Sequence, residues 1–202
     1  MNQSTSTAWR EYAADVLPPI LQAALGCFME AGYHGTSIRT VASRAGLSVP
    51  GVYHHYRSKQ ALLVEIDAYA MQDLWERCVA ALEEAGDDVG RRFDLLVECQ
   101  VLFHAHRQAL AFIASSEIRA LEAEARAHHI AERDRVQRLM DQVIHAGVEQ
   151  GRLRTPYPRE AGLAIITMCT SVAQWYRIGK GLTPQELAER YRSVARMAVG
   201  LA

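Results

Sequence analysis

Residues Gly32–Leu63 read GYHGTSIRTVASRAGLSVPGVYHHYRSKQALL, and this stretch decides the fold that we expect. Apolar residues recur at helical spacing in two short runs, 38–45 and 49–56. Gly46 falls between the runs, and Ser48 stands where a side-chain hydroxyl can cap the second one. Two short helices joined by three or four residues that include glycine form a helix-turn-helix.

Hydroxyl side chains also mark the start of the neighbouring helices. Thr36 or Ser37 can cap the first short helix. Ser58 can cap a longer helix, which the apolar spacing extends to about Leu82. The sequence therefore predicts a helix-turn-helix that leads directly into a long helix.

The rest of the chain also has helical periodicity, and no strand pattern stands out. A first helix runs from Pro18 or Pro19 to Gly32, and Thr183 with Glu186 forms a capping box at the start of the last one. The remaining predicted helices cover residues 89–105, 108–121, 123–151, 159–179 and 184–200. We expect an all-α protein with about nine helices.

Length and composition indicate a globular protein. The chain has 202 residues, of which half are apolar and 22% are charged. Its longest uncharged stretch, 161–176, is too short and too polar to cross a membrane, and its first residues lack the apolar run of a secretory signal. We expect a cytoplasmic protein with no membrane partner, divided into a helix-turn-helix domain (1–60) and a second helical domain (61–202).

Cysteine and histidine spacing argues against a metal site. The four cysteines lie far apart without a Cys-x-x-Cys pair, and neither pair of nearby histidines has zinc-ligand spacing. No phosphate-binding glycine loop, nucleophile motif or acid-base pair appears either. The sequence therefore predicts no enzyme, no cofactor and no metal.

The second short helix has residue types that suit a nucleic-acid groove. The first residues of such a helix enter the major groove of DNA. Pro50 and Gly51 are small enough for the backbone to approach a duplex, and three ring side chains that can donate hydrogen bonds follow. These are Tyr53, His54 and His55.

This region resembles the TetR-type transcriptional regulators. The matching residues are Gly32-Tyr33, Gly35-Thr36-Ser37, Ala42, Ala45-Gly46-Leu47-Ser48, Gly51-Val52-Tyr53-His54-His55-Tyr56 and Ser58-Lys59. The resemblance implies a regulator that binds double-stranded DNA, with an aromatic core role for Tyr56. It implies phosphate contacts at Thr36, Ser37, Tyr53 and Lys59, and groove contacts at Pro50, Gly51, His54 and His55, with Ser48 at the start of the reading helix.

The charge distribution gives only weak support to this reading. Residues 1–60 carry a net charge of +2 and the remainder −3, and Arg10 is the only basic residue before the first helix. A small positive patch predicts modest affinity for DNA and strong dependence on salt. A helix pair with a glycine turn can also be pure packing, so an all-α ligand carrier or interaction module without DNA binding is the alternative.

The resemblance also implies a homodimer built from the last two helices of each chain. Residues 161–172 are apolar nearly all round, which predicts a helix buried on every side. The interface residues that we expect are Leu163, Ile166, Leu187, Tyr191, Val194 and Ala198. The alternative is that these residues form a core within one chain.

Finally, the resemblance implies an effector pocket within the fourth to seventh helices. Candidate lining residues, each of which could instead be ordinary core, are Trp75, Phe103, His104, Phe112, Arg119, Met140, Trp175 and Arg177. Three segments, 115–121, 147–154 and 175–191, are similar to TetR-type repressors of fatty-acid and steroid catabolism that respond to acyl-CoA thioesters. The prediction is a repressor released from a palindromic operator by a small apolar effector of that kind, with Arg119 and Arg177 facing its phosphates.

Overall fold

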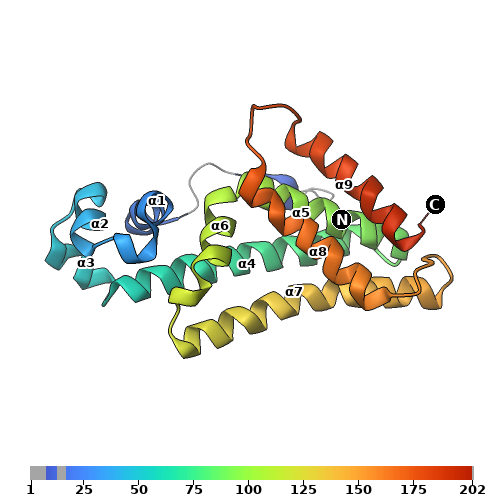
Figure 1. Cartoon of the computed structure of the whole chain (residues 1–202), viewed down its shortest axis with the longest axis horizontal. Helices are drawn as coiled ribbons and strands as arrows, with labels where there is room; N and C mark the ends of the chain where they lie inside the picture. The colour runs from blue at the N-terminus through green and yellow to red at the C-terminus, as the bar shows by residue number, and fades with distance from the viewer. Residues whose placement is uncertain (1–7, 13–16, 202) are drawn as a thin grey trace, which may run out of the picture. The chain divides into compact units, whose positions relative to one another are not determined.

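We describe a computed structural model of the chain, which covers residues 8–12 and 17–201. Within these residues the chain is helical and contains no strand (Figure 1). The helices are α1 (Pro19–Gly35), α2 (Ile38–Ala45), α3 (Val49–His55), α4 (Lys59–Ala85), α5 (Val89–His106), α6 (Gln108–Ser116), α7 (Ala123–Glu149), α8 (Pro158–Trp175) and α9 (Pro184–Val199), with short 3-10 helices η1 (Ala8–Arg10) and η2 (Ile118–Ala120). The predicted all-α fold and helix number are confirmed for the described part of the chain.

Local capping explains why the helix-turn-helix forms where it was predicted. The Oγ of Ser37 accepts a hydrogen bond from the amide of Thr40 at 3.1 Å, and the Oγ of Ser48 accepts one from the amide of Gly51 at 3.1 Å. Gly46 ends α2 with φ 68°, a left-handed conformation that favours glycine. These short-range contacts fix the turn between α2 and α3.

Two predicted helices end earlier than their apolar patterns suggested. α8 ends at Trp175 instead of residue 179, because Tyr176 is extended and Gly179 and Gly181 have positive φ angles. α6 ends at Ser116, and η2 follows it. In both cases residues with helical spacing lie in connecting segments, where periodicity alone is a poor guide to the boundary.

The described chain groups into two compact units, and α4 and α7 each run from one unit into the other. We call residues 17–72 and 109–132 the N-terminal unit, and residues 8–12, 73–108 and 133–201 the C-terminal unit. The first half of α4 therefore belongs to the same unit as α1–α3. The predicted division at residue 60 would cut this unit just after α4 begins.

Each unit has its own core. In the N-terminal unit, Val41 of α2 and Val52 of α3 are fully buried against apolar residues of α1, α4 and α6. In the C-terminal unit, α5 packs against both α8 and α9 (Figure 1). α5 is therefore the helix that is buried nearly all round.

The structure corrects the expectation that α8 is buried on every side. Ile165, Cys169 and Val172 are buried, but Leu163 and Thr167 are exposed on the opposite side of the helix. A helix that lies on a single neighbouring layer covers only one of its faces. The second apolar face of α8 is open in the single chain.

Candidate nucleic-acid interface

The outward face of α3 follows from the position of Val52. An α-helix turns by about 100° per residue, so Pro50 and His54 lie nearly opposite the buried Val52. Tyr53 lies beside them and has 48% of its surface exposed. Pro50, Tyr53 and His54 therefore form the face of α3 that is open to a partner.

His55 and Gly51 lie at the edges of this face. His55 is exposed but borders, with Tyr56, a hollow of about 340 Å³ whose other residues are Pro18, Pro19, Ile20, Ala45 and Leu47. Tyr56 is half-buried against the core, and burial raises the pKa of its phenol. A Cβ on Gly51 would approach the Oγ of Ser48 to 3.3 Å, so a small residue suits the helix cap as well as a DNA approach.

The hydroxyl of Thr36, a residue at which the resemblance implied a phosphate contact, is not free. Its side chain is only 3% exposed, and its Oγ1 lies 3.0 Å from the carbonyl oxygen of Cys27 and 2.8 Å from that of Gly32. α1 kinks at Gly32 (φ 69°), which leaves carbonyl groups at this end in need of donors. We therefore correct the predicted phosphate contact: the Thr36 side chain serves the end of α1.

Lys59 is also engaged at the end of α1. Its Nζ donates hydrogen bonds to the carbonyl oxygens of Tyr33 at 2.6 Å and Thr36 at 2.7 Å, and it lies 4.2 Å from the centre of the Tyr33 ring. A cation at a helix C-terminus satisfies unpaired carbonyls and the helix dipole. The ammonium group is thus a cap, and only its remaining N–H could reach a phosphate.

Two arginines that were not predicted as contacts are better placed as free cations. Arg39 lies in the first turn of α2, and Arg57 lies two residues after the end of α3; both are exposed and have no ion-pair partner among residues 8–12 and 17–201. Arg44, by contrast, makes a bidentate pair with Glu30 at 2.6 and 2.7 Å. The positions of Arg39 and Arg57 beside the two capped helices could have indicated them from the sequence.

Ser37 and Ser48 remain at the surface of the N-terminal unit. Both side chains are exposed, and each oxygen accepts a backbone amide at the start of its helix. The Ser37 hydroxyl also pairs with the Oγ1 of Thr40 at 2.8 Å. The Ser48 hydroxyl hydrogen is the freer of the two to meet a phosphate.

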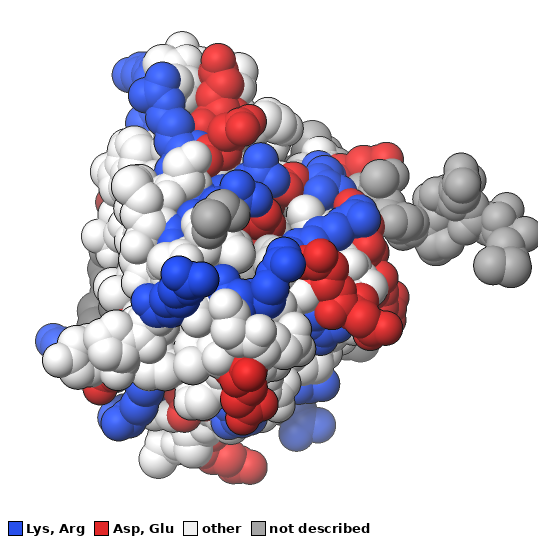
Figure 2. All heavy atoms as spheres, turned by 90° about the vertical axis from the view of Figure 1, so that its right-hand side faces the viewer, with Lys and Arg blue, Asp and Glu red and all other residues white. Residues whose placement is uncertain are grey.

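The C-terminal unit has no single-sign basic surface on the face drawn in Figure 2. Basic and acidic side chains lie beside each other there. Within the same unit, Arg196 pairs with Asp94, and hydrogen bonding to Asp94 raises the pKa of Arg196. Neighbouring opposite charges of this kind cancel at the range over which a duplex would be attracted.

The predicted effector residues are divided between the two units. Phe103, His104 and Met140 are buried in the C-terminal unit. The Nδ1 of His104 lies 2.7 Å from the carbonyl oxygen of Gln100, and burial lowers the pKa of His104 to about 4. Phe112 belongs to the N-terminal unit, so it shares no core with these three.

The other candidates are more accessible. The guanidinium of Arg135 lies 3.5 Å from the centre of the half-buried Trp75 ring. Trp175 and Arg177 are exposed where α8 meets the following loop, and Arg119 is exposed on η2 of the N-terminal unit. Arg177 donates a hydrogen bond to the carbonyl oxygen of Tyr176 at 2.6 Å, and the structure does not gather the eight residues in one unit.

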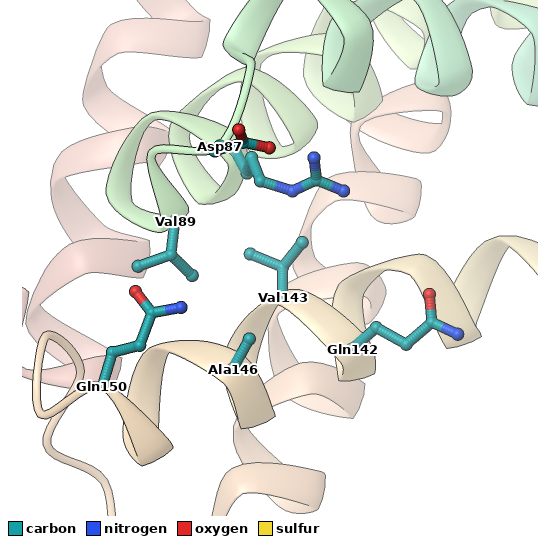
Figure 3. Close-up of a pocket in the computed structure, with 7 residues that line it drawn as sticks. Asp87, Val89, Gln142, Val143, Ala146 and Gln150 are labelled. Carbon is teal, nitrogen blue, oxygen red and sulfur yellow. The ribbon is translucent and has the colours of Figure 1, made fainter.

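A hollow of about 270 Å³ opens on the C-terminal unit between the start of α5 and the end of α7 (Figure 3). Val89, Val143 and Ala146 point into it, and Gln142 and Gln150 stand at its edges. None of the predicted effector residues is among those that line it, which also include Asp87 and Arg92. This hollow and the predicted pocket are therefore different places.

The predicted dimer residues separate into exposed and buried ones. Leu163, Val194 and Ala198 are exposed, and Ile166 and Tyr191 are half-buried. Leu187 is only 3% exposed and packs inside its own chain, so we correct its predicted interface role. Met197, three residues after Val194 on the same helix, is 73% exposed and was not among the predicted residues.

Two further features concern other kinds of site. Among the described residues, no three His, Cys, Asp or Glu side chains come together as a set of metal ligands. Every helix in the described part of the chain is too short or too polar to span a membrane.

Two family models match the chain. One, described as "Bacterial regulatory proteins, tetR family", matches residues 20–66, which include α2 and α3. The other, "Tetracyclin repressor-like, C-terminal domain", matches residues 86–199, more than half of the chain.

Similar proteins cover nearly the whole chain. The "HTH-type transcriptional repressor KstR2" of Mycobacterium tuberculosis is 26% identical over 178 residues, which are 87% of this chain and 88% of the repressor. A bacterial regulatory protein in the tetR family from Rhodococcus RHA1 superposes with a TM-score of 0.85 and 28% identity, covering 91% of this chain and 96% of the other. AibR in complex with isovaleryl coenzyme A and operator DNA superposes with a TM-score of 0.77 and 23% identity, over 88% of this chain and 95% of AibR, and shows the same fold.

The family matches fall on the unit whose α3 exposes Pro50, Tyr53 and His54 and on the helices that follow it. The curated relatives along the whole length are transcriptional regulators and not enzymes. The chain belongs to the TetR family and is a DNA-binding transcriptional regulator.

Proposed function

We propose that this regulator is a repressor that binds a palindromic operator as a homodimer and is released by an acyl-CoA thioester. The observation that carries the proposal is the outward face of α3, where Pro50, Tyr53 and His54 are exposed and take no part in the buried core. A dimer would present two such helices to half-sites about one helical turn, ~34 Å, apart. Arg39 and Arg57 would pair with the phosphates beside each half-site.

The exposed side of α8 and α9 supports the dimer. Leu163 on α8 and Val194, Met197 and Ala198 on α9 are exposed, and the three on α9 follow helical spacing on one face. Large exposed apolar patches mark interaction surfaces in soluble proteins. α8 and α9 contact each other, so two copies related by a twofold axis would bury these faces as four helices.

The relatives support the effector class. KstR2 is a named repressor, and AibR was solved with isovaleryl coenzyme A. In this chain an acyl group would need apolar surroundings such as those of Phe103 and Met140. Arg177, which is exposed on the same unit as these two residues, could pair with the phosphates of the coenzyme.

Selection of bound duplexes from a random pool tests the DNA half of the proposal. The full chain should enrich inverted repeats whose half-sites are about 10 base pairs apart, and binding should fall steeply with salt. The double variant Tyr53→Ala/His54→Ala should abolish enrichment, whereas Tyr157→Ala, an exposed residue of the C-terminal unit, should not. No enrichment at low salt, or enrichment of unrepeated sites only, would overturn it.

Release from the enriched duplex tests the effector half. Isovaleryl-CoA and longer straight-chain acyl-CoA thioesters should lower the bound fraction, while coenzyme A and the free acids should not. Equal release by coenzyme A alone would show that the acyl group is not read. Retention of DNA with every thioester would place the effector in another chemical class.

A further inference from the structure

The segment that precedes α1 and the helix-turn-helix belongs to the C-terminal unit. Residues 8–12 precede α1 in sequence but belong to the C-terminal unit, where η1 packs against α5. Trp9 is 3% exposed, and its Nε1 donates a hydrogen bond to the Oε2 of Glu84 at 2.7 Å. The segment is therefore anchored by a buried aromatic side chain.

Arg10 ties this segment to two helices at once. Its Nη1 donates to Glu84 of α4 at 2.6 Å, and its Nε donates to Glu98 of α5 at 2.6 Å. Burial alone would raise the pKa of Glu84, but the hydrogen bonds from Arg10 and Trp9 outweigh it and lower that pKa. Arg10 bridges Glu84 and Glu98, and it can do so only while the two carboxylates stay close.

Arg77 of α4 holds the same segment from the backbone side. Its Nη1 donates to the carbonyl oxygens of Trp9 at 2.6 Å and Glu11 at 3.0 Å. Its guanidinium lies 4.0 Å from the centre of the Tyr12 ring, which stacks on His106 at 4.3 Å between ring centres. Every residue from Trp9 to Tyr12 therefore has a contact with α4 or α5.

One contact in this arrangement is unfavourable. The Tyr12 hydroxyl is buried and has no hydrogen-bond partner among the described residues. Burial raises the pKa of Tyr12 well above its ordinary value, so the group is a neutral donor without an acceptor. Such a group costs free energy that is recovered when it reaches water.

We propose that residues 8–12 form a releasable strap that senses the spacing of α4 and α5. The strap is fastened to both helices, so it stays closed only while they keep their present separation, and the Tyr12 hydroxyl favours its release. Only residues 13–16 separate the strap from Leu17, where the N-terminal unit begins. This inference rests on the proposed function, in which effector binding moves α4 against α5. Such a movement would release the strap and so affect the helix-turn-helix in a second way, in addition to the movement of α4 itself.

The same contacts exclude the segment from the DNA interface. Arg10 is the only basic residue before α1, its guanidinium group pairs with two carboxylates of the C-terminal unit, and it lies 3.9 Å from the centre of the Trp9 ring. Closed, the strap offers no free cation to a phosphate.

Quenching of Trp9 fluorescence by acrylamide tests the strap. The variant Trp75→Phe/Trp175→Phe keeps Trp9 as the single tryptophan of the three. In this background we expect weak quenching, a rise of threefold or more with Arg10→Ala, and no rise with Tyr12→Phe, which keeps the ring and removes the unpaired hydroxyl. Arg138→Ala, an exposed arginine of α7, is the control and should change nothing. Strong quenching of Trp9 in the parent, or no increase in quenching with Arg10→Ala, would overturn the proposal of a strap.

Overpacking tests the sensing of helix spacing. The Sγ atoms of Cys78 on α4 and Cys99 on α5 are 3.8 Å apart and fully buried, so Cys99→Leu should push the two helices apart and increase the quenching of Trp9. Ala195→Leu, which overpacks α9, is the control and should leave quenching low. Cys99→Val is the milder variant if leucine prevents folding. Unchanged quenching in a folded Cys99 variant would refute the sensing role.

A salt titration with random duplex separates the strap from a DNA-binding arm. Arg10→Ala should leave the slope of log affinity against log salt unchanged, whereas Arg57→Ala should reduce it by about 0.9 per chain. An equal reduction with Arg10→Ala would make the segment a DNA arm and overturn the strap. A chain that bound no duplex would sink the proposed function, while the quenching experiments would still decide the strap.

Discussion

Val52 and His54 are two residues apart on α3 and have opposite environments. Val52 is fully buried, and the rotation of the helix turns His54 away from the core. One residue type thus holds the helix in place, while the other is free to donate a hydrogen bond to a base edge. The two residues have different roles because they lie on opposite sides of the helix axis, although they are close in sequence.

His54→Ala should change the sequence preference of the regulator. Loss of a base contact costs about 1–3 kcal/mol per half-site at the preferred base and little at others. Competition among operator variants measures this difference, and His55→Ala, at the edge of the face, is the control with a smaller effect. A uniform loss on every sequence would assign His54 to the phosphate backbone.

His104 should make the folded state sensitive to mild acid. Burial depresses its pKa from 6.5 to about 4, so between these values the unfolded chain binds the proton and the folded one does not. The free energy of unfolding therefore falls as the pH falls, by about 2 kcal/mol from this group between pH 7 and pH 5. Denaturant titrations should show a smaller fall in His104→Leu than in the parent chain; equal falls would mean that the pKa of His104 is the same in the folded and unfolded chain.

At the scale of elements, the junction of α1, α2 and α4 is held by polar contacts as well as by the core. Thr36 and Lys59 satisfy carbonyl groups at the end of α1, just where Gly32 breaks its regular hydrogen bonding. The start of α4 is therefore tied to the end of α1. Both residues fit the family pattern for a reason that the side-chain chemistry alone did not indicate.

Lys59→Gln should destabilise the chain. Removal of two charge-assisted hydrogen bonds to the end of α1 lowers the free energy of unfolding by about 1–3 kcal/mol. Arg57→Gln, two residues earlier and exposed, should leave stability unchanged and weaken DNA binding instead. If Lys59→Gln unfolds like the parent and only lowers the salt slope, the ammonium group points to DNA in solution.

The elements that the sequence predicted well are those fixed by neighbouring residues. Ser37 and Ser48 cap their helices through amides three residues away, and the Thr183–Glu186 box does the same for α9. Contacts between distant residues were not predictable from spacing. Lys59 reaches Tyr33, and Leu187 is buried within its own chain, because of packing that no local pattern encodes.

For the whole molecule, the main feature is the apolar surface that α8 and α9 leave exposed in a single chain. Leu163, Val194 and Met197 are exposed, although their helices pack firmly on α5 through their other faces. The sequence pattern of α8 predicted burial on every side, and the structure satisfies it on one side only. The other side is the one for which we propose a second copy.

Val194→Asp/Met197→Asp should therefore shift the chain from dimer to monomer. Buried carboxylates at the centre of an apolar interface cost several kcal/mol, whereas the same residues are harmless on an exposed face. Sedimentation velocity at micromolar concentration measures the change, and Tyr157→Asp, exposed elsewhere, is the control. A monomer in the unmodified chain, or a dimer in the double variant, would rule out this interface.

The small number of unpaired arginines in and next to α2 and α3 has a consequence for a bacterium under osmotic stress. Among residues 37–59, Arg39 and Arg57 are the arginines without ion-pair partners in the described chain, so two copies would carry four. Four neutralised phosphates make affinity fall about tenfold when the ionic strength doubles. In a cell that accumulates potassium in a drying or saline habitat, the regulator would therefore bind its DNA more weakly. This loss of binding would need no metabolite.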